Sequence, residues 1–139
     1  MDWDLNVVQT FPQTTLTVSN FRYGFHKGDF LYVGNDAGVL VKYQISTNTI
    51  IAEVRTPETA VIYNIILINN DFLLLQTNTS KILLYDLNLN FIKMWDFYKT
   101  TTGGGYVLAD NNNTIWTKSE SQPTKIYKKQ FIDLTKDII

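Results

Sequence analysis

The chain has 139 residues, of which 45% are hydrophobic and 18% charged, and its formal net charge is −1. This length suits one ordinary domain, and a near-neutral chain lacks the basic footprint that nucleic acid or an acidic membrane surface attracts. With no cysteine and one histidine, His26, the chain has no disulfide framework or cysteine nucleophile, and a histidine-based triad is disfavoured. We therefore expect no metal, no cofactor and no catalytic residues.

The N-terminus, Met1-Asp2-Trp3-Asp4, has neither the basic nor the apolar region of a secretory signal. The longest apolar stretches lie around Val61–Ile68 and Phe72–Leu75. Both are shorter than the ~20 residues of a membrane span. The sequence therefore predicts a cytoplasmic protein with no membrane and no nucleic-acid partner.

The composition favours strands over helices. The chain contains 17 Thr, 14 Ile and 9 Val but only 4 Ala and 3 Glu, and β-branched side chains suit a pleated, half-buried surface. Clusters of Asn, Asp, Gly and Ser recur about every ten residues and indicate turns. In chain order, we expect strands at 21–26, 29–34, 39–45, 50–55, 63–68, 71–77, 81–87, 91–97, 105–109, 113–118 and 123–132, with no clean fourth strand in the last group.

A period of 42 residues organises these strands. Asp29-Phe30-Leu31 recurs as Asp71-Phe72-Leu73. A constant offset of 42 also aligns Arg22 with Asn64 and Tyr106. Four short strands in each repeat of about 40–45 residues are the signature of a β-propeller blade.

A family resemblance lies in the second hairpin of each repeat. The segment 34–50, with its Asp36-Ala37-Gly38 turn, resembles the WD-repeat pattern, and Tyr85-Asp86-Leu87 matches the aromatic-Asp pair. Tyr32-Val33 and Thr47-Asn48-Thr49 resemble a YVTN-type repeat equally well. The chain departs from the WD pattern at Tyr43-Gln44 and Tyr127-Lys128, and it lacks the Gly-His start. The resemblance implies an all-β propeller of four-stranded antiparallel blades, a superfold that serves mostly as an interaction platform but also hosts lectins and enzymes.

The predicted ring is incomplete. We expect one partial propeller with repeats at about 21–62, 63–104 and 105–139, and with 1–20 completing a further or shared blade. Propellers usually have about 4–8 blades, so three blades leave two bare faces. We expect a homodimer of two three-blade halves, with a terminal strand donated between chains. A larger assembly or a longer chain would equally supply the missing blades.

The candidate binding residues are polar or aromatic groups on inner strands and turns. Arg22 is one of two arginines and suits an anion or a partner carboxylate, although a structural ion pair is the plainer interpretation. The aromatic candidates pack between blades or form stacking platforms, and the acidic candidate bonds turn amides or a partner. The full set is Arg22, Asp36, Tyr63, Tyr106 and Trp116.

These features predict a non-enzymatic protein-interaction scaffold. Its presenting surface is formed by loops at 35–38, 56–62, 77–80, 98–104 and 119–122. The alternative is an oligomeric carbohydrate-binding propeller, which requires the same polar and aromatic set in every blade. A propeller hydrolase or quinoprotein fragment is disfavoured because the His, Glu and metal-ligating residues that it needs are missing.

Overall fold

The computed structural model describes residues 10–12, 21–57, 61–77, 81–96, 105–110, 114–119 and 126–130. Their regular structure is β-strand: β1 (Phe21–Lys27), β2 (Phe30–Asn35), β3 (Val39–Gln44), β4 (Thr49–Arg55), β5 (Ile62–Ile68), β6 (Phe72–Thr77), β7 (Lys81–Asp86), β8 (Phe91–Asp96), β9 (Gly105–Ala109), β10 (Thr114–Ser119) and β11 (Tyr127–Gln130). Each lies on a strand that the sequence predicts. No helix of membrane-spanning length and hydrophobicity occurs in these ranges.

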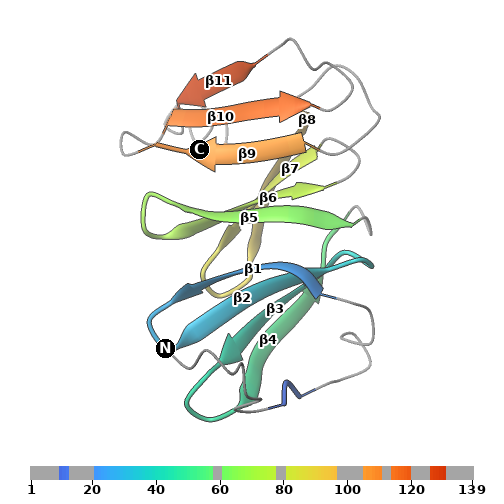
Figure 1. Ribbon diagram of the computed structural model, residues 1–139, viewed down its shortest axis with the longest axis vertical. Coiled ribbons are helices and arrows are strands. Elements are labelled where there is room, and N and C mark those ends of the chain that lie inside the picture. Colours follow the sequence, from blue (N-terminus) through green and yellow to red (C-terminus); the bar gives the residue numbers. More distant parts are fainter. Residues whose placement is uncertain are drawn as a thin grey trace, which may run out of the picture.

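The strands form three antiparallel sheets, which we call blades 1, 2 and 3. Blade 1 has the order β1-β2-β3-β4, blade 2 the order β5-β6-β7-β8, and blade 3 the order β9-β10-β11 in its described part. The blades lie in a row with blade 2 in the middle, and their first strands β1, β5 and β9 run side by side (Figure 1). This is the arrangement that propeller blades require, and it confirms the predicted fold.

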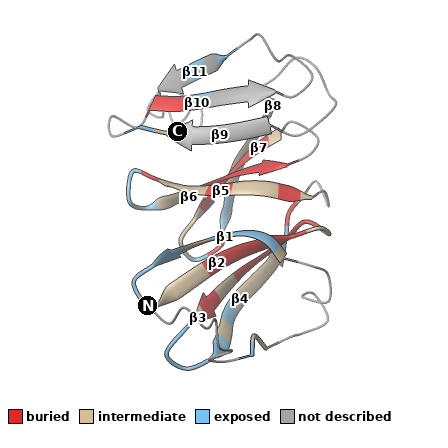
Figure 2. Cartoon of the chain, in the orientation of Figure 1, coloured by how far each residue is buried: buried red, intermediate tan, exposed pale blue. Residues whose placement is uncertain are grey.

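Apolar residues on both faces of the inner strands hold the row together. Between blades 1 and 2, Tyr32 and Leu40 of blade 1 form one buried cluster with residues of blade 2 that include Ile65 and Leu73. A second cluster joins blades 2 and 3 and consists of Ile68, Leu74, Ile82, Leu84 and Ile115. Figure 2 shows the buried positions concentrated on the middle strands of the blades. Because blade 2 is covered on both faces, its strands are almost continuously hydrophobic.

A third cluster lies on the face of blade 1 that points away from blade 2. It consists of Val33, Val39, Val41 and Tyr43. Phe11, from the short described segment 10–12, packs on this face with its ring 5.1 Å from Phe21 and 4.6 Å from Tyr43. The chain before β1 therefore covers part of the free face of blade 1.

The strand pairing corrects the register of the first strands. In blade 1, Lys27 pairs with Phe30 across a two-residue turn, whereas in blade 2 Ile68 pairs with Phe72 across three residues. The extra loop residue shifts the first strand by one, so the constant offset of 42 was wrong there. The pairing makes Tyr23, Asn64 and Tyr106 equivalent, and Arg22 does not belong with them.

Arg22 instead occupies a β-bulge. The pairing of β1 with β2 shifts between Phe21 and Tyr23, which leaves Arg22 as the extra residue. The pairing of β5 with β6 shifts in the same way around Tyr63. A bulge commonly re-aims a side chain at the edge of a sheet, so Arg22 and Tyr63 hold equivalent, redirected positions.

Several predictions fall outside the described residues. They include the blade-completing role of 1–9 and 13–20, a fourth strand of blade 3, and most of the loops 77–80, 98–104 and 119–122.

Candidate functional site

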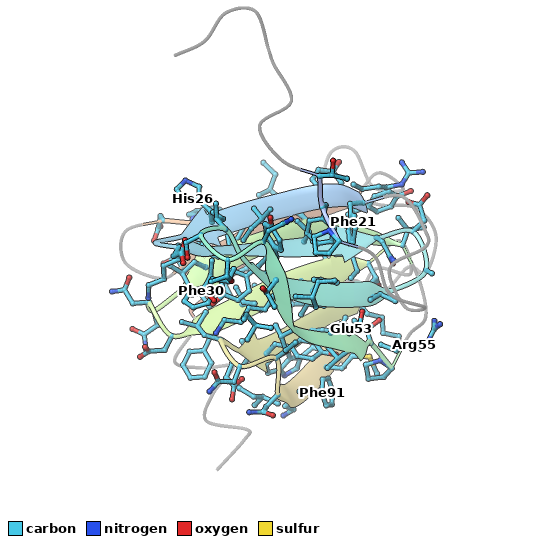
Figure 3. All side chains as sticks on the ribbon, turned by 90° about the horizontal axis from the view of Figure 1, so that it is seen from below. Phe21, His26, Phe30, Glu53, Arg55 and Phe91 are labelled. Carbon is cyan, nitrogen blue, oxygen red and sulfur yellow. The ribbon has the colours of Figure 1, made fainter. Side chains whose placement is uncertain are left out.

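One edge of the blades brings three of the predicted site residues together. We call it the entry rim: the edge where β1 and β5 begin, with the turn 36–38 and the end of β4. In Figure 3, Phe21 and Arg55 lie toward this edge, and His26 and Phe30 lie toward the opposite one. The Thr56 amide donates to the Gly38 carbonyl at 2.8 Å, which ties the end of β4 to the turn. The described part of the predicted presenting surface therefore shares one rim.

The turn on this rim is held by Asn35. Its side-chain oxygen accepts hydrogen bonds from the amides of Ala37 at 2.9 Å and Val39 at 2.8 Å. Gly38 completes the turn with φ 76°, a left-handed conformation that glycine adopts without strain. Asn35 is fully buried. Because Asn35 satisfies these amides, Asp36 is left to point elsewhere.

Asp36 forms an ion pair with Arg22. The Arg22 Nε donates to Oδ1 of Asp36, and the two side chains are 51% and 30% exposed. The hydrogen bond and the charge of Asp36 raise the pKa of Arg22, and Tyr63 and Tyr23 act in the same direction. Tyr63 of blade 2 therefore lies within electrostatic reach of the Arg22–Asp36 pair of blade 1. The sequence analysis gave two interpretations of Arg22, a site for an anion or partner carboxylate and a structural ion pair. The structure shows an ion pair within the chain.

Two other turn carboxylates, Asp29 and Asp86, accept hydrogen bonds from turn residues. Asp29 accepts from the Ser46 amide at 2.9 Å and from its hydroxyl, which lowers the pKa of Asp29. Partial burial raises the pKa of Asp86, but hydrogen bonds from Asn90 and Asn88 outweigh it, so the net shift is downward. These carboxylates cap turns.

Trp116 lies apart from the entry rim, in β10 of blade 3. Its Nε1 donates to Asp110 Oδ2 at 3.2 Å, and the Lys128 Nζ lies 5.6 Å from the centre of its rings. The indole is 39% exposed. Sequence reasoning missed Asp110 and Lys128 as partners of Trp116. Lys128 could have been found from the pairing of β10 with β11, in which it lies opposite Trp116.

Trp116 is equivalent to two residues that neighbouring blades bury. Tyr32, Leu74 and Trp116 are all central residues of the second strand, each paired with the third strand. Tyr32 is 2% exposed and Leu74 is fully buried. The same position is therefore covered where a blade follows and open in blade 3.

The remaining candidates are placed as follows. Tyr106 lies in β9, opposite Lys118 of β10, and its side chain lies outside the described part of the structure. His26 is exposed near the end of β1. Among the described residues, no three His, Cys, Asp or Glu side chains come together as a metal site would require.

Comparisons with known proteins identify the fold. No protein-family model and no curated protein matches the sequence. Similar solved structures include the computationally designed Ika4 protein, with a TM-score of 0.69, 8% identity, and 91% of this chain and 75% of that chain covered. The WD40 domain of Toxoplasma gondii coronin gives 0.63 and 11%, with 82% and 35% covered. The RRP9 WD40 repeats give 0.61 and 4%, with 76% and 33% covered.

The chain thus spans about a third of the length of these two WD40 structures. Its fold is that of β-propeller blades, and the solved structures similar to it include WD40 propellers.

Proposed function

We propose that this chain is a non-enzymatic protein-interaction scaffold, and that its three blades form half of a six-bladed ring completed by a second copy. The observation that carries the proposal is the 39% exposure of Trp116, whose equivalents in blades 1 and 2 are buried by the next blade. An open blade face of this kind requires a partner surface.

The free energy involved is large for a chain of this size. A four-stranded face of strands ~5–6 residues long covers roughly 350 Å². At ~25 cal/mol per Å², leaving it bare forfeits up to about 9 kcal/mol. Ordinary domains have a total stability of about 5–15 kcal/mol. Covering the face therefore decides whether the blades are stable.

The entry rim supports the scaffold role. It combines an arginine, an aspartate and two tyrosines, Tyr23 being 43% exposed, and tyrosine and arginine are enriched in protein interfaces. Arg22 and Asp36 pair with each other on this rim, and Asp29 and Asp86 hold turns. This arrangement suits recognition better than acid–base chemistry.

The carbohydrate-binding alternative is not favoured. It requires one recurring set of side chains, but the bulge holds Arg22 in blade 1 and Tyr63 in blade 2. The described pairing of β9 with β10 has no such shift.

Sedimentation equilibrium or light scattering tests the ring. We expect a mass twice the 16.0 kDa of one chain, with a concentration-dependent thermal midpoint. A mass of one chain throughout the micromolar range refutes the ring. Binding of protein partners is tested separately with Arg22→Ala and Tyr63→Ala in the purified assembly. If both variants lose binding while the mass of the assembly is unchanged, the entry rim is supported as the recognition surface. If both variants bind as the unmodified chain does, the entry rim is not the recognition surface.

A further inference from the structure

We infer that Ile45 of one copy packs on Trp116 of a second copy, and that this contact occurs twice and joins blade 1 of each copy to blade 3 of the other. In the proposed six-bladed ring, on which this inference rests, these residues meet at each of the two joints. The model for the joint is the contact between blades 1 and 2, because both halves of that contact recur in exposed form at the two ends of the row.

The contact between blades 1 and 2 joins an aromatic residue to an aliphatic one. The hydroxyl of Tyr32 in blade 1 donates to the carbonyl oxygen of Leu87 in blade 2 at 3.5 Å. The Leu87 side chain packs, partly buried, against the cluster that contains Tyr32 and Leu40. Tyr32 and Leu40 are both buried. Leu87 therefore helps to cover the second strand of the preceding blade.

Blade 3 repeats the first half of this contact. Lys128 pairs with Trp116 across β10 and β11, as Lys42 pairs with Tyr32 across β2 and β3. The two lysine Nζ atoms lie 5.6 Å and 5.8 Å from the centres of these aromatic rings. The strand pairing and the cation–π geometry thus give Trp116 the place in blade 3 that Tyr32 has in blade 1.

The repeated half is exposed. Ile126 precedes Lys128 by two residues, as Leu40 precedes Lys42. Leu40 is fully buried, whereas Ile126 is 69% exposed and Trp116 is 39% exposed. Paired residues and residues two apart in a strand point to the same side of a sheet. The two apolar side chains therefore form one patch on the outward face of blade 3.

Blade 1 repeats the second half. Ile45 follows Tyr43 by two residues, as Leu87 follows Tyr85. The two tyrosines are equivalent, since each pairs with the second residue of its neighbouring second strand. The Ile45 amide donates to the Asp29 carbonyl at 2.8 Å, which fixes its place after β3. Ile45 is 38% exposed, so blade 1 presents in the open the group that Leu87 packs on a neighbour.

The charges at the two ends agree with this joint. Lys42 of blade 1 lies within electrostatic reach of Asp86 of blade 2. Lys128 is the equivalent of Lys42, and Gln44 directly precedes Ile45 as Asp86 directly precedes Leu87. Gln44 in turn donates a hydrogen bond to the carboxylate of Asp29. The lysine of blade 3 thus approaches a carboxylate of blade 1, which favours association.

The two halves must come from different copies. Blades 1 and 3 lie at opposite ends of the row with blade 2 between them (Figure 1). A second copy supplies each end with its complement, and two such joints related by a two-fold axis close the assembly. Two joints with faces of roughly 350 Å² bury about 1,400 Å² in total, within the range of stable interfaces.

Single substitutions test each half of the contact. Ile45→Ala and Trp116→Ala each remove apolar surface from both joints, so each should raise the dissociation constant of the dimer at least tenfold. Ile51→Ala is the matched control, because this isoleucine of β4 is 48% exposed and lies outside both halves. It should leave the dissociation constant unchanged. Sedimentation equilibrium measures the constants, and circular dichroism at the same concentrations checks that the blades are folded.

A mixture of the two variants tests whether the residues touch. In the heterodimer one joint keeps both native residues and the other carries both alanines. If Ile45 and Trp116 contact each other, the second alanine in a joint costs less than the first. Native mass spectrometry should then show more heterodimer than the two homodimer concentrations predict for independent residues. A mixture of Ile51→Ala and Trp116→Ala should show no such excess.

The outcomes separate the contact from the ring. A monomeric unmodified chain overturns both. A dimer that Ile45→Ala leaves unchanged, or a mixture without excess heterodimer, leaves the ring standing and overturns the contact.

Discussion

Gly34 of blade 1 lies close to Ile62 of blade 2, and its replacement tests the packing between the two blades. A Cβ at Gly34 would lie 2.6 Å from Cγ2, 2.8 Å from Cβ and 3.0 Å from Cδ1 of Ile62. Favourable carbon–carbon contacts lie at about 3.5–4.0 Å. Ile62 is fully buried and its Cβ is fixed to the backbone, so the side chain cannot simply rotate away. Gly34→Ala therefore has to move β5 relative to β2.

The magnitude follows from two opposing effects. Overpacking of a buried site costs about 1–3 kcal/mol, and contact with a Cβ places this site at the upper end. Replacing glycine by alanine also restricts the unfolded chain, which stabilises by about 0.4–1 kcal/mol. We expect Gly34→Ala to lower the free energy of unfolding by about 2 kcal/mol.

A double-mutant cycle in urea measures this contact. Ile62→Ala removes Cγ2 and Cδ1, so Gly34→Ala should cost at least about 1 kcal/mol less in that background. Gly24→Ala is the control: its Cβ would meet Val33 Cγ1 at 2.8 Å, inside blade 1, and its cost should not depend on Ile62. A Gly34→Ala chain as stable as the unmodified one, or equal costs in the two backgrounds, refutes the packing.

Three further predictions concern ionisable groups. Burial raises the pKa of Tyr85 to about 12, above the ~10 of an unfolded tyrosine, so this group's contribution to stability is complete below pH 10 and falls by about 2 kcal/mol toward pH 12. Tyr85→Phe should flatten that part of the urea-midpoint curve, and an unchanged slope contradicts the assignment. The lowered pKa of Asp86 means that its contribution is present above the unfolded value of ~3.9 and is lost as the pH falls through the folded pKa. Asp86→Asn should therefore reduce the acid sensitivity of the midpoint below pH 4, and an identical acid profile counts against it. Arg22→Ala should leave both the denaturation midpoint and the assembly mass unchanged, because the pair is exposed; a marked loss of either shows that the rim is structural.

The repeat made most of the fold predictable. Strand positions follow from segments rich in β-branched and aromatic residues, which clusters of turn residues bound about every ten residues. The second strands, which include Leu31 and Leu73, agree with the 42-residue offset. The difference in length lies in the hairpin that precedes them and displaces only the first strands. First strands were misaligned because a hairpin of two residues and one of three give the same strand with different numbering. A sequence offset cannot show where an extra residue is absorbed.

The site was less predictable because it depends on turns and bulges. Asp36 was expected either to bond turn amides or to meet a partner, and the structure assigns the turn amides to the preceding residue, Asn35. The bulge that redirects Arg22 has no residue signature, since it is defined only by pairing. Lys42 and Lys128 are equivalent because they lie opposite Tyr32 and Trp116. A longer connection in blade 3 hid this equivalence in the sequence, although Gln44 and Gln130 repeat the same spacing after each lysine.

The differing hairpins have a consequence for recognition. The extra residue of blade 2 is taken up at the rim opposite the entry rim, where Asn69 and Asn70 adopt φ of 52° and 60°. The bulges of Arg22 and Tyr63 therefore stay level on the entry rim although they are 41 residues apart. Each chain presents one arginine and one tyrosine at this level instead of a repeated group. In the proposed ring the two-fold axis doubles this pair, so a protein that recognises it should bind two per ring.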